Sequence, residues 1–259
     1  MIILLHTSKT MREAPPADGW SFGGRLGTPA LLKRAEELVA AVRDMSVEQI
    51  VSAMKVSAPL AGKTVGTFAA WTARGTMPAA ETFLGDIYSG LRAAAFSAED
   101  REYASGHLRI LSGLYGVLRP FDGISPYRLE LGYKLPHLGS LYSFWGSDVA
   151  AQLPSTGPIV NLAANEYSKV VLPFVEAARV VTPRFLTVEP VSGEPKFVAV
   201  HAKIARGAFA RWLVMSRGGA AVKDFAELGY ALDPALGSDR EPCFVCTEFG
   251  GKGLSVRLT

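Results

Sequence analysis

Short apolar runs bounded by turn residues recur along the chain, and they predict strands. The first run, Met1 to Thr7, predicts a buried strand. The stretch from Leu108 to Leu118 has the apolar density of a strand buried on both faces, and Arg128 and Glu130 then share one face of an extended return segment. Four further strands are predicted in GPIVNLAA, VVTPRFLTV, KFVAVHAK and CFVCTEF.

Between these runs, apolar residues recur at helical spacing. Thr28-Pro29 offers a capping residue and a first-turn proline ahead of a predicted helix in ALLKRAEELVAAVRDM. Ser46 is predicted to cap a short helix, with Gln49 as its capping-box partner. Further helices are predicted from Gly62 to Trp71, in AAETFLGDIYSGLRAAAF, from Ser97 through Glu102 and in ARGAFARWLVMSR, while the Pro- and Gly-rich REAPPADGWSFGG is predicted to be a loop.

This irregular alternation indicates a mixed α/β (α+β) fold, and we expect residues 1–259 to form a single compact domain. With 49% hydrophobic residues, the chain can bury a large core. No stretch is long and apolar enough for a membrane span, and MIILLHTSKT lacks the leading basic residues of a signal peptide. The sequence therefore predicts a soluble cytoplasmic protein that has no membrane partner.

The positive charge of the chain is unevenly distributed. The net charge is +3, but the segment from His107 to Arg217 has 12 basic and 7 acidic residues. This excess is consistent with a locally basic surface that faces an anionic partner. The alternative is an ordinary solvated surface of mixed charge.

Gly62-Lys63-Thr64 resembles part of a phosphate-binding loop, but Ser57 stands where that loop needs a glycine. The segment fits a different arrangement better. In this arrangement, a first helix is followed by the short hairpin SAPLA and by a second helix that begins at Gly62. The first N–H groups of the second helix, with Lys63, would then bind a phosphate. Residues 46–72 thus resemble a helix-hairpin-helix element, the alternative being an ordinary packed pair of helices.

Neither a metal site nor a cofactor motif is evident. Cys243 and Cys246 have C-x-x-C spacing, but in a strand they point to opposite faces, and no second pair completes a zinc site. The four histidines are scattered, and there is no nucleophile elbow or dinucleotide-binding glycine pattern. We therefore predict buried structural cysteines, no bound metal and no cofactor.

Charged residues at the ends of apolar runs are the best candidates for a site, because α/β proteins build their clefts there. Glu130 and Glu166 could offset positive charge in such a cleft, or act as acid and base if the protein is an enzyme. Ion pairing without function is the alternative. The cations predicted to line a basic cleft and bind phosphate are Lys9, Arg128, Lys169, Lys203 and Arg206.

Six motifs resemble those of the YaaA family of bacterial peroxide-stress proteins. They are TSKT, FLGDIYSGL, HLRILSGLYGVLRPFDGISPYRLELG, YSFWG, IVNLAANEYSKVV and HAKIARG. The resemblance implies one α/β domain of unusual topology with a basic cleft and a helix-hairpin-helix element. It also implies binding of double-stranded or branched DNA, and protection from hydrogen peroxide by limiting free iron and DNA damage.

The chain also departs from this family's pattern. It has Thr7-Ser8-Lys9-Thr10 where the family often has SPAKT, and Ala58-Pro59 where the hairpin often carries an acidic and a basic residue. His201 stands where an aromatic residue is common. These departures suggest a divergent member with a small-molecule role.

Two hypotheses about function follow. The first is a DNA-binding protein of the peroxide-stress response, and the second is an enzyme that processes a nucleotide or another phosphate-bearing small molecule. A narrow cavity around Arg128 and Glu166 would favour catalysis, whereas an open groove would favour DNA. The sequence shows no cluster of residues that could bind iron directly.

Overall fold

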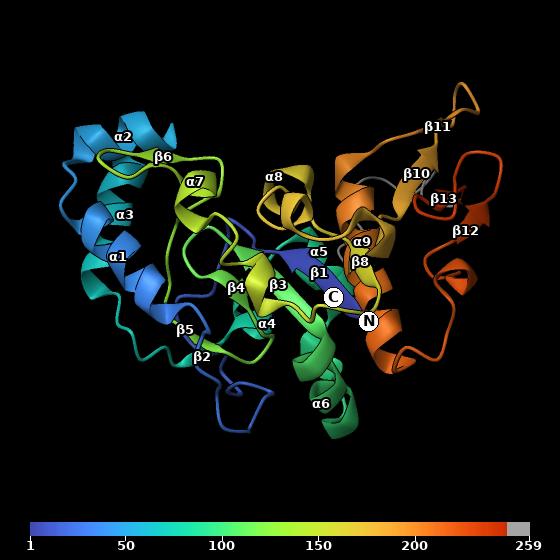
Figure 1. The fold of residues 1–259 in the computed structure, drawn as a ribbon, viewed down its shortest axis with the longest axis horizontal. Coiled ribbons are helices and arrows are strands. Elements are labelled where there is room, and N and C mark those ends of the chain that lie inside the picture. The colour runs from blue at the N-terminus through green and yellow to red at the C-terminus, as the bar shows by residue number, and fades with distance from the viewer. Residues whose placement is uncertain (248–259) are drawn as a thin grey trace.

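A five-stranded sheet forms the centre of the molecule in the computed structural model, which describes residues 1–247 (Figure 1). Its strand order is β4-β3-β1-β8-β9. The strands are parallel except β4, which runs antiparallel to β3. Their bounds are β1 Ile2–His6, β3 Leu108–Ser112, β4 Gly116–Leu118, β8 Ile159–Asn161 and β9 Val180–Val181.

A second sheet, with the order β11-β10-β13-β12, lies at one end of the molecule. Its strands are β10 Arg184–Val188, β11 Pro195–Lys196, β12 Tyr230–Asp233 and β13 Cys243–Cys246. Phe209 of the long helix α9 (Ala199–Met215) packs against aromatic rings of this sheet, 5.7 Å from Phe185 and 5.5 Å from Phe244 between centroids. Aromatic packing thus fixes α9 on this sheet.

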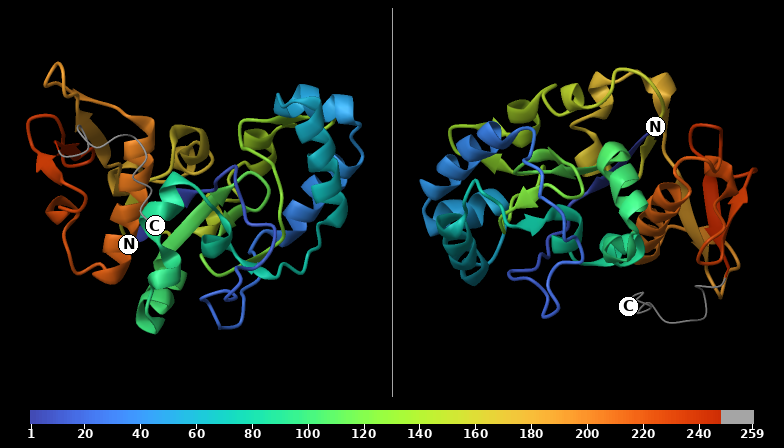
Figure 2. Two further views of the ribbon diagram at one scale, coloured as in Figure 1. Left: turned by 180° about the vertical axis from the view of Figure 1, so that it is seen from behind. Right: turned by 90° about the horizontal axis from the view of Figure 1, so that it is seen from below.

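Three helices form the opposite end of the molecule, as the views in Figures 1 and 2 both show. They are α1 Leu32–Arg43, α2 Val47–Met54 and α3 Ala58–Ala70. Two short ladders complete the strands, pairing β2 (Met77–Pro78) with β5 (Gly123–Ile124) and β6 (Lys134–Leu135) with β7 (Gly139–Ser140).

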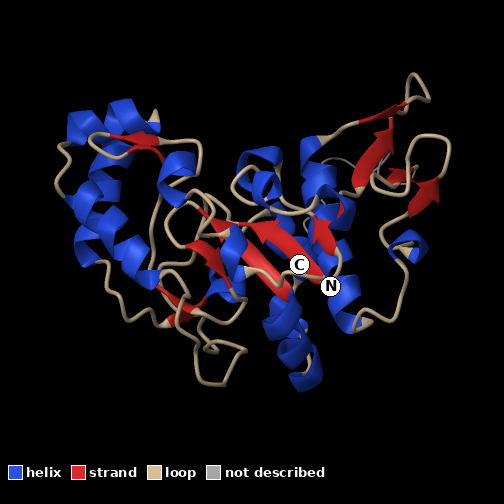
Figure 3. Cartoon of the chain, viewed as in Figure 1, coloured by secondary structure: helices blue, strands red, loops and turns tan. Residues whose placement is uncertain are grey.

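Shorter helices link these parts, and Figure 3 shows how they alternate with strands around the central sheet. The α-helices are α4 Ala79–Thr82, α5 Asp86–Leu91, α6 Ala98–His107, α7 Leu141–Trp145 and α8 Asn165–Ser168. Single 3-10 turns are formed by Ala93–Ala95, Ala150–Gln152, Leu172–Phe174, Ala177–Arg179 and Val222–Asp224.

The predicted mixed α/β fold is confirmed, as are the elements with strong local signals. All five residues of β1 are buried between two parallel neighbours, which explains its unbroken apolar run. Ser46 caps α2, and its capping box with Gln49 is formed in both directions. Ser97 likewise caps α6, which runs on to His107, beyond the predicted end at Glu102.

Three helix predictions were wrong in their boundaries. Thr28 is not the cap of α1, which begins at Leu32. The stretch AAETFLGDIYSGLRAAAF is interrupted between α4 and α5, where Gly85 has a φ of +102°. The third helix begins at Ala58 rather than Gly62, because Ser57 and Pro59 supply a capping position and a first-turn proline.

Several strand predictions were also wrong in detail. Leu108 to Leu118 is not one strand but the antiparallel pair β3–β4, turned through Gly116 at a φ of +66°. VVTPRFLTV splits into β9 and β10, and most of KFVAVHAK belongs to β11 and the start of α9. The segment that carries Arg128 and Glu130 belongs to no strand.

One continuous cluster of buried apolar side chains includes Leu4 of the central sheet and Phe244 of the second sheet. Among residues 1–247, the helices fall short of the length and apolar character needed to cross a membrane.

Candidate functional site

Three adjoining cavities lie around the loop that follows the carboxyl end of β1. This strand has β3 on one side and β8 on the other, so the chain order of the sheet reverses there. Such a switch point leaves a crevice outside the carboxyl ends of parallel strands, where α/β proteins commonly bind ligands. The topology therefore places this crevice directly after His6.

The inner cavity has a volume of about 440 Å³. Its wall is formed by the end of β1 and the following loop, by the start of α5, by the segment around Glu130, by α8 and by α9. Four of the predicted cleft residues meet in it, namely Lys9, Glu130, Glu166 and Lys203.

Glu130 is the buried acid of the inner cavity, with only 7% of its surface exposed. Burial raises its pKa, while the charge of Lys9 opposes that shift. Lys9 Nζ lies 3.7 Å from Glu130 Oε2, and the Tyr167 hydroxyl donates a hydrogen bond to the same oxygen at 3.2 Å. A carboxyl group in these surroundings keeps its proton to higher pH than usual, as general acids do.

His6 and Tyr167 also line the inner cavity, and neither was predicted as a site residue. Their rings stack with centroids 4.8 Å apart, and the Tyr167 hydroxyl also accepts a hydrogen bond from the Thr7 hydroxyl at 3.3 Å. Burial raises the pKa of Tyr167 far above its usual value. The hydroxyl therefore keeps its proton and can donate to Glu130.

The imidazole of His6 is held in its neutral form. Burial, followed by the charges of Arg206 and Lys203, lowers its pKa to about 3. Nδ1 accepts a hydrogen bond from the Ala164 N–H at 3.1 Å, which leaves the proton on Nε2. Two signals in the sequence could have pointed to this residue pair: His6 lies next to the end of the strand predicted from Met1 to Thr7, and Tyr167 directly follows Glu166.

Glu166 connects α8 to the segment after Glu130. Its Oε1 accepts a hydrogen bond from the Gly132 N–H at 3.1 Å, and the Tyr142 hydroxyl donates to its backbone carbonyl at 2.8 Å. Unlike Glu130, Glu166 is exposed, and its charge contributes to the raised pKa of Glu130. The two acids thus occupy different surroundings, which is the arrangement that separates acid and base roles.

Close packing of α5 against α9 brings two cations to His6. A methyl group on Gly207 would overlap the carbonyl oxygen of Ile87, and one on Gly90 would overlap that of Ile204. The two glycines therefore allow the helix backbones to touch. Lys203 consequently lines the inner cavity, and the charge of Arg206 reaches His6.

Two further cavities adjoin the inner one. An outer cavity of about 710 Å³, which includes Lys55 and Lys134, shares Lys9 and both glutamates with it. A side cavity of about 230 Å³ contains Lys63 and Arg128 and also borders Lys9. Lys9 is therefore in contact with all three spaces.

Comparison with known proteins identifies the family. Residues 1–236 match the family model described as "Peroxide stress protein YaaA". The chain belongs to the YaaA peroxide stress protein family. A UPF0246 protein of Salinispora tropica is 57% identical over 263 residues, with 99% of this chain and 98% of that protein covered. A UPF0246 protein of Cupriavidus metallidurans is 42% identical, with 92% of this chain and 96% of that protein covered.

Four of the six motifs by which the sequence resembles the YaaA family supply predicted site residues to the inner cavity. TSKT contributes Lys9, the long central motif contributes Glu130, IVNLAANEYSKVV contributes Glu166, and HAKIARG contributes Lys203. These four segments are far apart in the sequence. The fold brings them together at the carboxyl end of β1.

Other predicted site residues lie elsewhere. Arg206 is half-buried near His6, Arg128 lies in the side cavity, and Lys169 is exposed and lines none of the three cavities.

Gly62 lies in the second turn of α3, where helical N–H groups bond to carbonyls of the preceding turn. The prediction that the Gly62 N–H binds a phosphate was therefore wrong. Lys63 forms an ion pair with Glu13 at 2.6 Å.

Two wider expectations are not confirmed. Four of the five residues in the expected hairpin SAPLA form the first turn of α3, so the helix-hairpin-helix element is not established. The inner cavity is mixed in charge rather than basic, since Asp86, Glu130 and Glu166 line it together with Lys9 and Lys203. Within residues 1–247, no group of three His, Cys, Asp or Glu side chains is arranged to hold a metal ion.

Proposed function

We propose that this member of the peroxide stress family binds a nucleotide, or another phosphate-bearing small molecule, in the inner cavity and processes it there. The observation that carries the proposal is the buried Glu130 with its raised pKa, hydrogen-bonded to Tyr167 at a topological switch point. A surface that only bound DNA would gain little from a buried acid among its cations.

The size of the inner cavity supports a small-molecule ligand. Its volume of about 440 Å³ lies in the range of roughly 300–1,000 Å³ that is usual for ligand pockets. The outer cavity adds space beyond the same two glutamates. A nucleotide-sized molecule can thus extend from one cavity into the other.

Each side chain has a chemical role in this proposal. Lys9 and Lys203 bind phosphate oxygens as point charges. The neutral His6 donates a hydrogen bond from Nε2 without adding charge. Glu130 gives a proton to the leaving group, and Glu166, the exposed acid, acts as the base that takes a proton from the attacking water.

Conversion and binding of nucleotides by the wild type and by Glu130→Gln test this proposal. We expect the wild type to convert at least one member of a panel of nucleoside mono-, di- and triphosphates, and the variant to bind that nucleotide without converting it. Lys203→Ala should weaken binding, whereas Lys196→Ala should not, because Lys196 pairs with Glu189 away from the cavities. A wild type that neither binds nor converts any nucleotide would contradict the proposal.

A second candidate function is binding of double-stranded or branched DNA, which would limit oxidative DNA damage and free intracellular iron. It is favoured by the spread of cations beyond the inner cavity, to Lys55 and Lys134 in the outer cavity and Arg128 in the side cavity. Because these cations would contact successive phosphates, affinity should fall steeply with salt.

Duplex and four-way-junction DNA, titrated at several salt concentrations, test the second candidate. We expect the double variant Lys55→Ala/Lys134→Ala to bind more weakly and to show a smaller salt dependence, by roughly one unit of slope for each lost phosphate contact. Lys203→Ala and Arg206→Ala should each weaken binding as well. Affinity that does not change with salt would exclude this function.

A further inference from the structure

A separate cavity of about 250 Å³ lies between the loop of residues 12–24 and helices α4 and α5. This loop is the dark-blue segment that projects below the central sheet in Figure 1. We call this space the loop cavity. It shares only Gly85 with the lining of the inner cavity. Its wall contains Phe83, Leu84, Tyr88 and Ser89 of the FLGDIYSGL motif, which have no part in the proposed function.

Glu81 is an incompletely partnered acid in the loop cavity. Its Oε2 accepts a hydrogen bond from the Ser21 N–H at 2.9 Å, which holds the loop against α4. Its Oε1 is buried and has no hydrogen-bond donor among residues 1–247. A buried carboxylate oxygen without a donor is costly, so this atom would gain from a ligand that brings an N–H group.

Two arginines border the same cavity, and their backbones are fixed. The Arg12 N–H donates to the Thr82 carbonyl at 2.8 Å, beside a bridge between Met11 and Phe83. Arg92 ends α5 in the left-handed region, at a φ of 49°, with its N–H bonded to the Tyr88 carbonyl at 3.0 Å. In the described part of the chain, neither arginine is within 4.0 Å of a carboxylate oxygen.

The rest of the wall is largely apolar. It includes Trp20 from the loop, Phe83 and Leu84 from the link between α4 and α5, and Ala93 from the following turn. At about 250 Å³, the space is smaller than the usual pocket for a nucleotide-sized ligand of roughly 300 Å³ or more. Its occupant must therefore be small and partly apolar.

We propose that the loop cavity is a second ligand site, for a small zwitterion such as an apolar amino acid. The carboxylate of the ligand pairs with Arg12 and Arg92, its ammonium group donates to Glu81 Oε1, and its side chain contacts the apolar wall. A simple anion would meet the Glu81 carboxylate, and a simple cation would meet two guanidinium groups. A zwitterion satisfies both sets of charges at once.

Calorimetric titration of the full-length wild type with L-leucine and two matched analogues tests this proposal. Isocaproate lacks the amino group of leucine, and isoamylamine lacks its carboxylate. We expect L-leucine to bind and each analogue to bind at least about tenfold more weakly, because a charged partner is left unpaired. Absence of leucine binding overturns the proposal, and isocaproate binding as tight as that of leucine overturns the role of Glu81.

Variants locate the site. Glu81→Gln keeps an oxygen for the Ser21 N–H but presents an amide to the ammonium group, and it should weaken leucine binding about tenfold. Arg92→Ala should have a similar effect, while Lys203→Ala in the inner cavity should have none. Unchanged affinity in both loop-cavity variants overturns the assignment. Because the site is independent of the inner cavity, nucleotide binding by Glu81→Gln should remain as in the wild type.

Discussion

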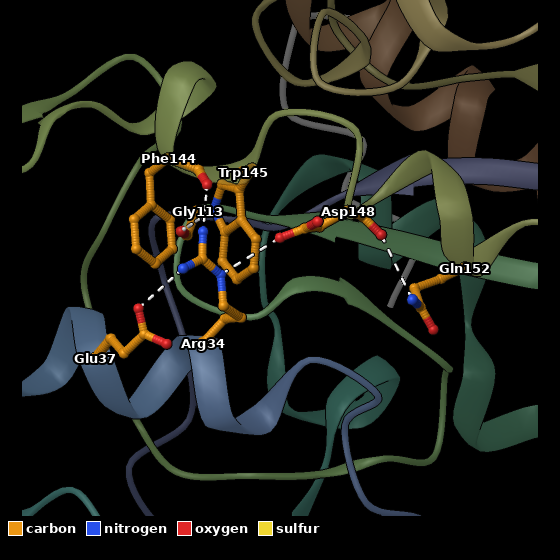
Figure 4. Close-up of polar contacts among 7 residues, drawn as sticks. All are labelled: Arg34, Glu37, Gly113, Phe144, Trp145, Asp148 and Gln152. Atoms are coloured by element: carbon orange, nitrogen blue, oxygen red, sulfur yellow. Dashed lines mark hydrogen bonds and ion pairs between the residues drawn. The ribbon is translucent and has the colours of Figure 1, made fainter.

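Arg34 and Glu130 are both charged side chains that contact neighbouring segments of the fold, but they differ in their ion-pair partners and in their burial. The Arg34 guanidinium has three oxygen neighbours: Nη1 donates to Glu37 at 2.9 Å and Nη2 to the Phe144 carbonyl at 2.5 Å, while Nε lies 3.3 Å from Asp148 as an ion pair without forming a hydrogen bond. Figure 4 shows this cluster, with the guanidinium also 4.0 Å from the centre of the Phe144 ring. The cluster joins α1 to α7, and each of its charged groups has an opposite charge within 3.3 Å.

Glu130 has a weaker set of partners in a more buried place. Its nearest cation, Lys9, is 3.7 Å away and 65% exposed at its side chain, whereas the Glu130 side chain is 9% exposed. Ion-pair geometry of this kind does not repay the desolvation of the carboxylate, which is why its pKa is raised. The difference teaches that one cluster joins two helices through closely paired charges, while the other lines a cavity with loosely paired charges, as the proposed function requires.

The largest effect that would sharpen this comparison is expected from Glu130→Gln. The amide keeps the size of the side chain and can still accept from Tyr167, but it has no proton to give. We expect the conversion of nucleotide to fall by about 100-fold or more, with no loss of thermal stability, because no charge remains to be desolvated.

The matched control is Glu37→Gln, which alters a carboxylate bound to Arg34 instead. It should leave the rate unchanged. Steady-state kinetics and thermal melts of both variants decide the matter. Equal rate losses in the two variants would mean that the Glu130 cluster has no special chemical role.

Gly207→Ala tests whether the inner cavity depends on the close contact of α5 with α9. The added methyl group would overlap the Ile87 carbonyl, so the helices must separate. We expect the free energy of unfolding to drop by about 3 kcal/mol, together with weaker phosphate binding as Lys203 moves away. Gly66→Ala in α3 is the control, because its methyl group meets no atom within 4 Å, and it should be neutral or slightly stabilising. Chemical denaturation of both variants measures the difference, and similar results for the two would refute the contact.

His6→Asn tests the buried, neutral imidazole through pH. The folded pKa of His6 is about 3, below its unfolded value of about 6.5, so its unfolded form binds more protons and stability is lost as pH falls from about 6.5 towards 3. At about pH 5, this loss amounts to about 2 kcal/mol relative to pH 7.

Asn can keep the hydrogen bond from the Ala164 N–H but does not titrate. Urea denaturation of the wild type and of His6→Asn at the two pH values should therefore show a steeper acid loss in the wild type. Equal slopes would show that His6 takes up its proton in the folded protein as it does in the unfolded chain, which at about pH 5 would place a third positive charge beside Lys203 and Arg206.

The sequence predicted those parts of the fold that depend on neighbouring residues. Ser46 and Gln49 lie three residues apart, and their capping box formed as expected. The boundaries of α3 could have been predicted too, since Ser57 and Pro59 give a start signal that Gly62 obscured. The division of Leu108 to Leu118 into two strands was not predicted, although Gly116, with its φ of +66°, is a residue type that permits such a turn.

The candidate site was predictable where a charged residue ends an apolar run. Lys9, Glu130, Glu166 and Lys203 were selected on that basis, and they line one cavity. The roles of His6 and Tyr167 could not be inferred in the same way, because the Thr7–Tyr167 hydrogen bond joins residues 160 positions apart. Burial and tautomer state depend on such distant contacts rather than on local pattern.

The smallest effect is expected from Arg34→Lys, which tests the structural role of the Arg34 cluster. A lysine keeps the positive charge but cannot serve Glu37, Asp148 and the Phe144 carbonyl together, and its contact with the ring is weaker. Arg34 is partly exposed, so solvent screens much of the loss, and we expect the free energy of unfolding to fall by about 1 kcal/mol. Lys33→Ala, at the exposed neighbouring position, should change it by less than about 0.5 kcal/mol. Nucleotide binding should be unchanged in both variants. If Arg34→Lys weakened nucleotide binding instead, the two clusters would be coupled through α7, and their division into a structural and a functional group would fail.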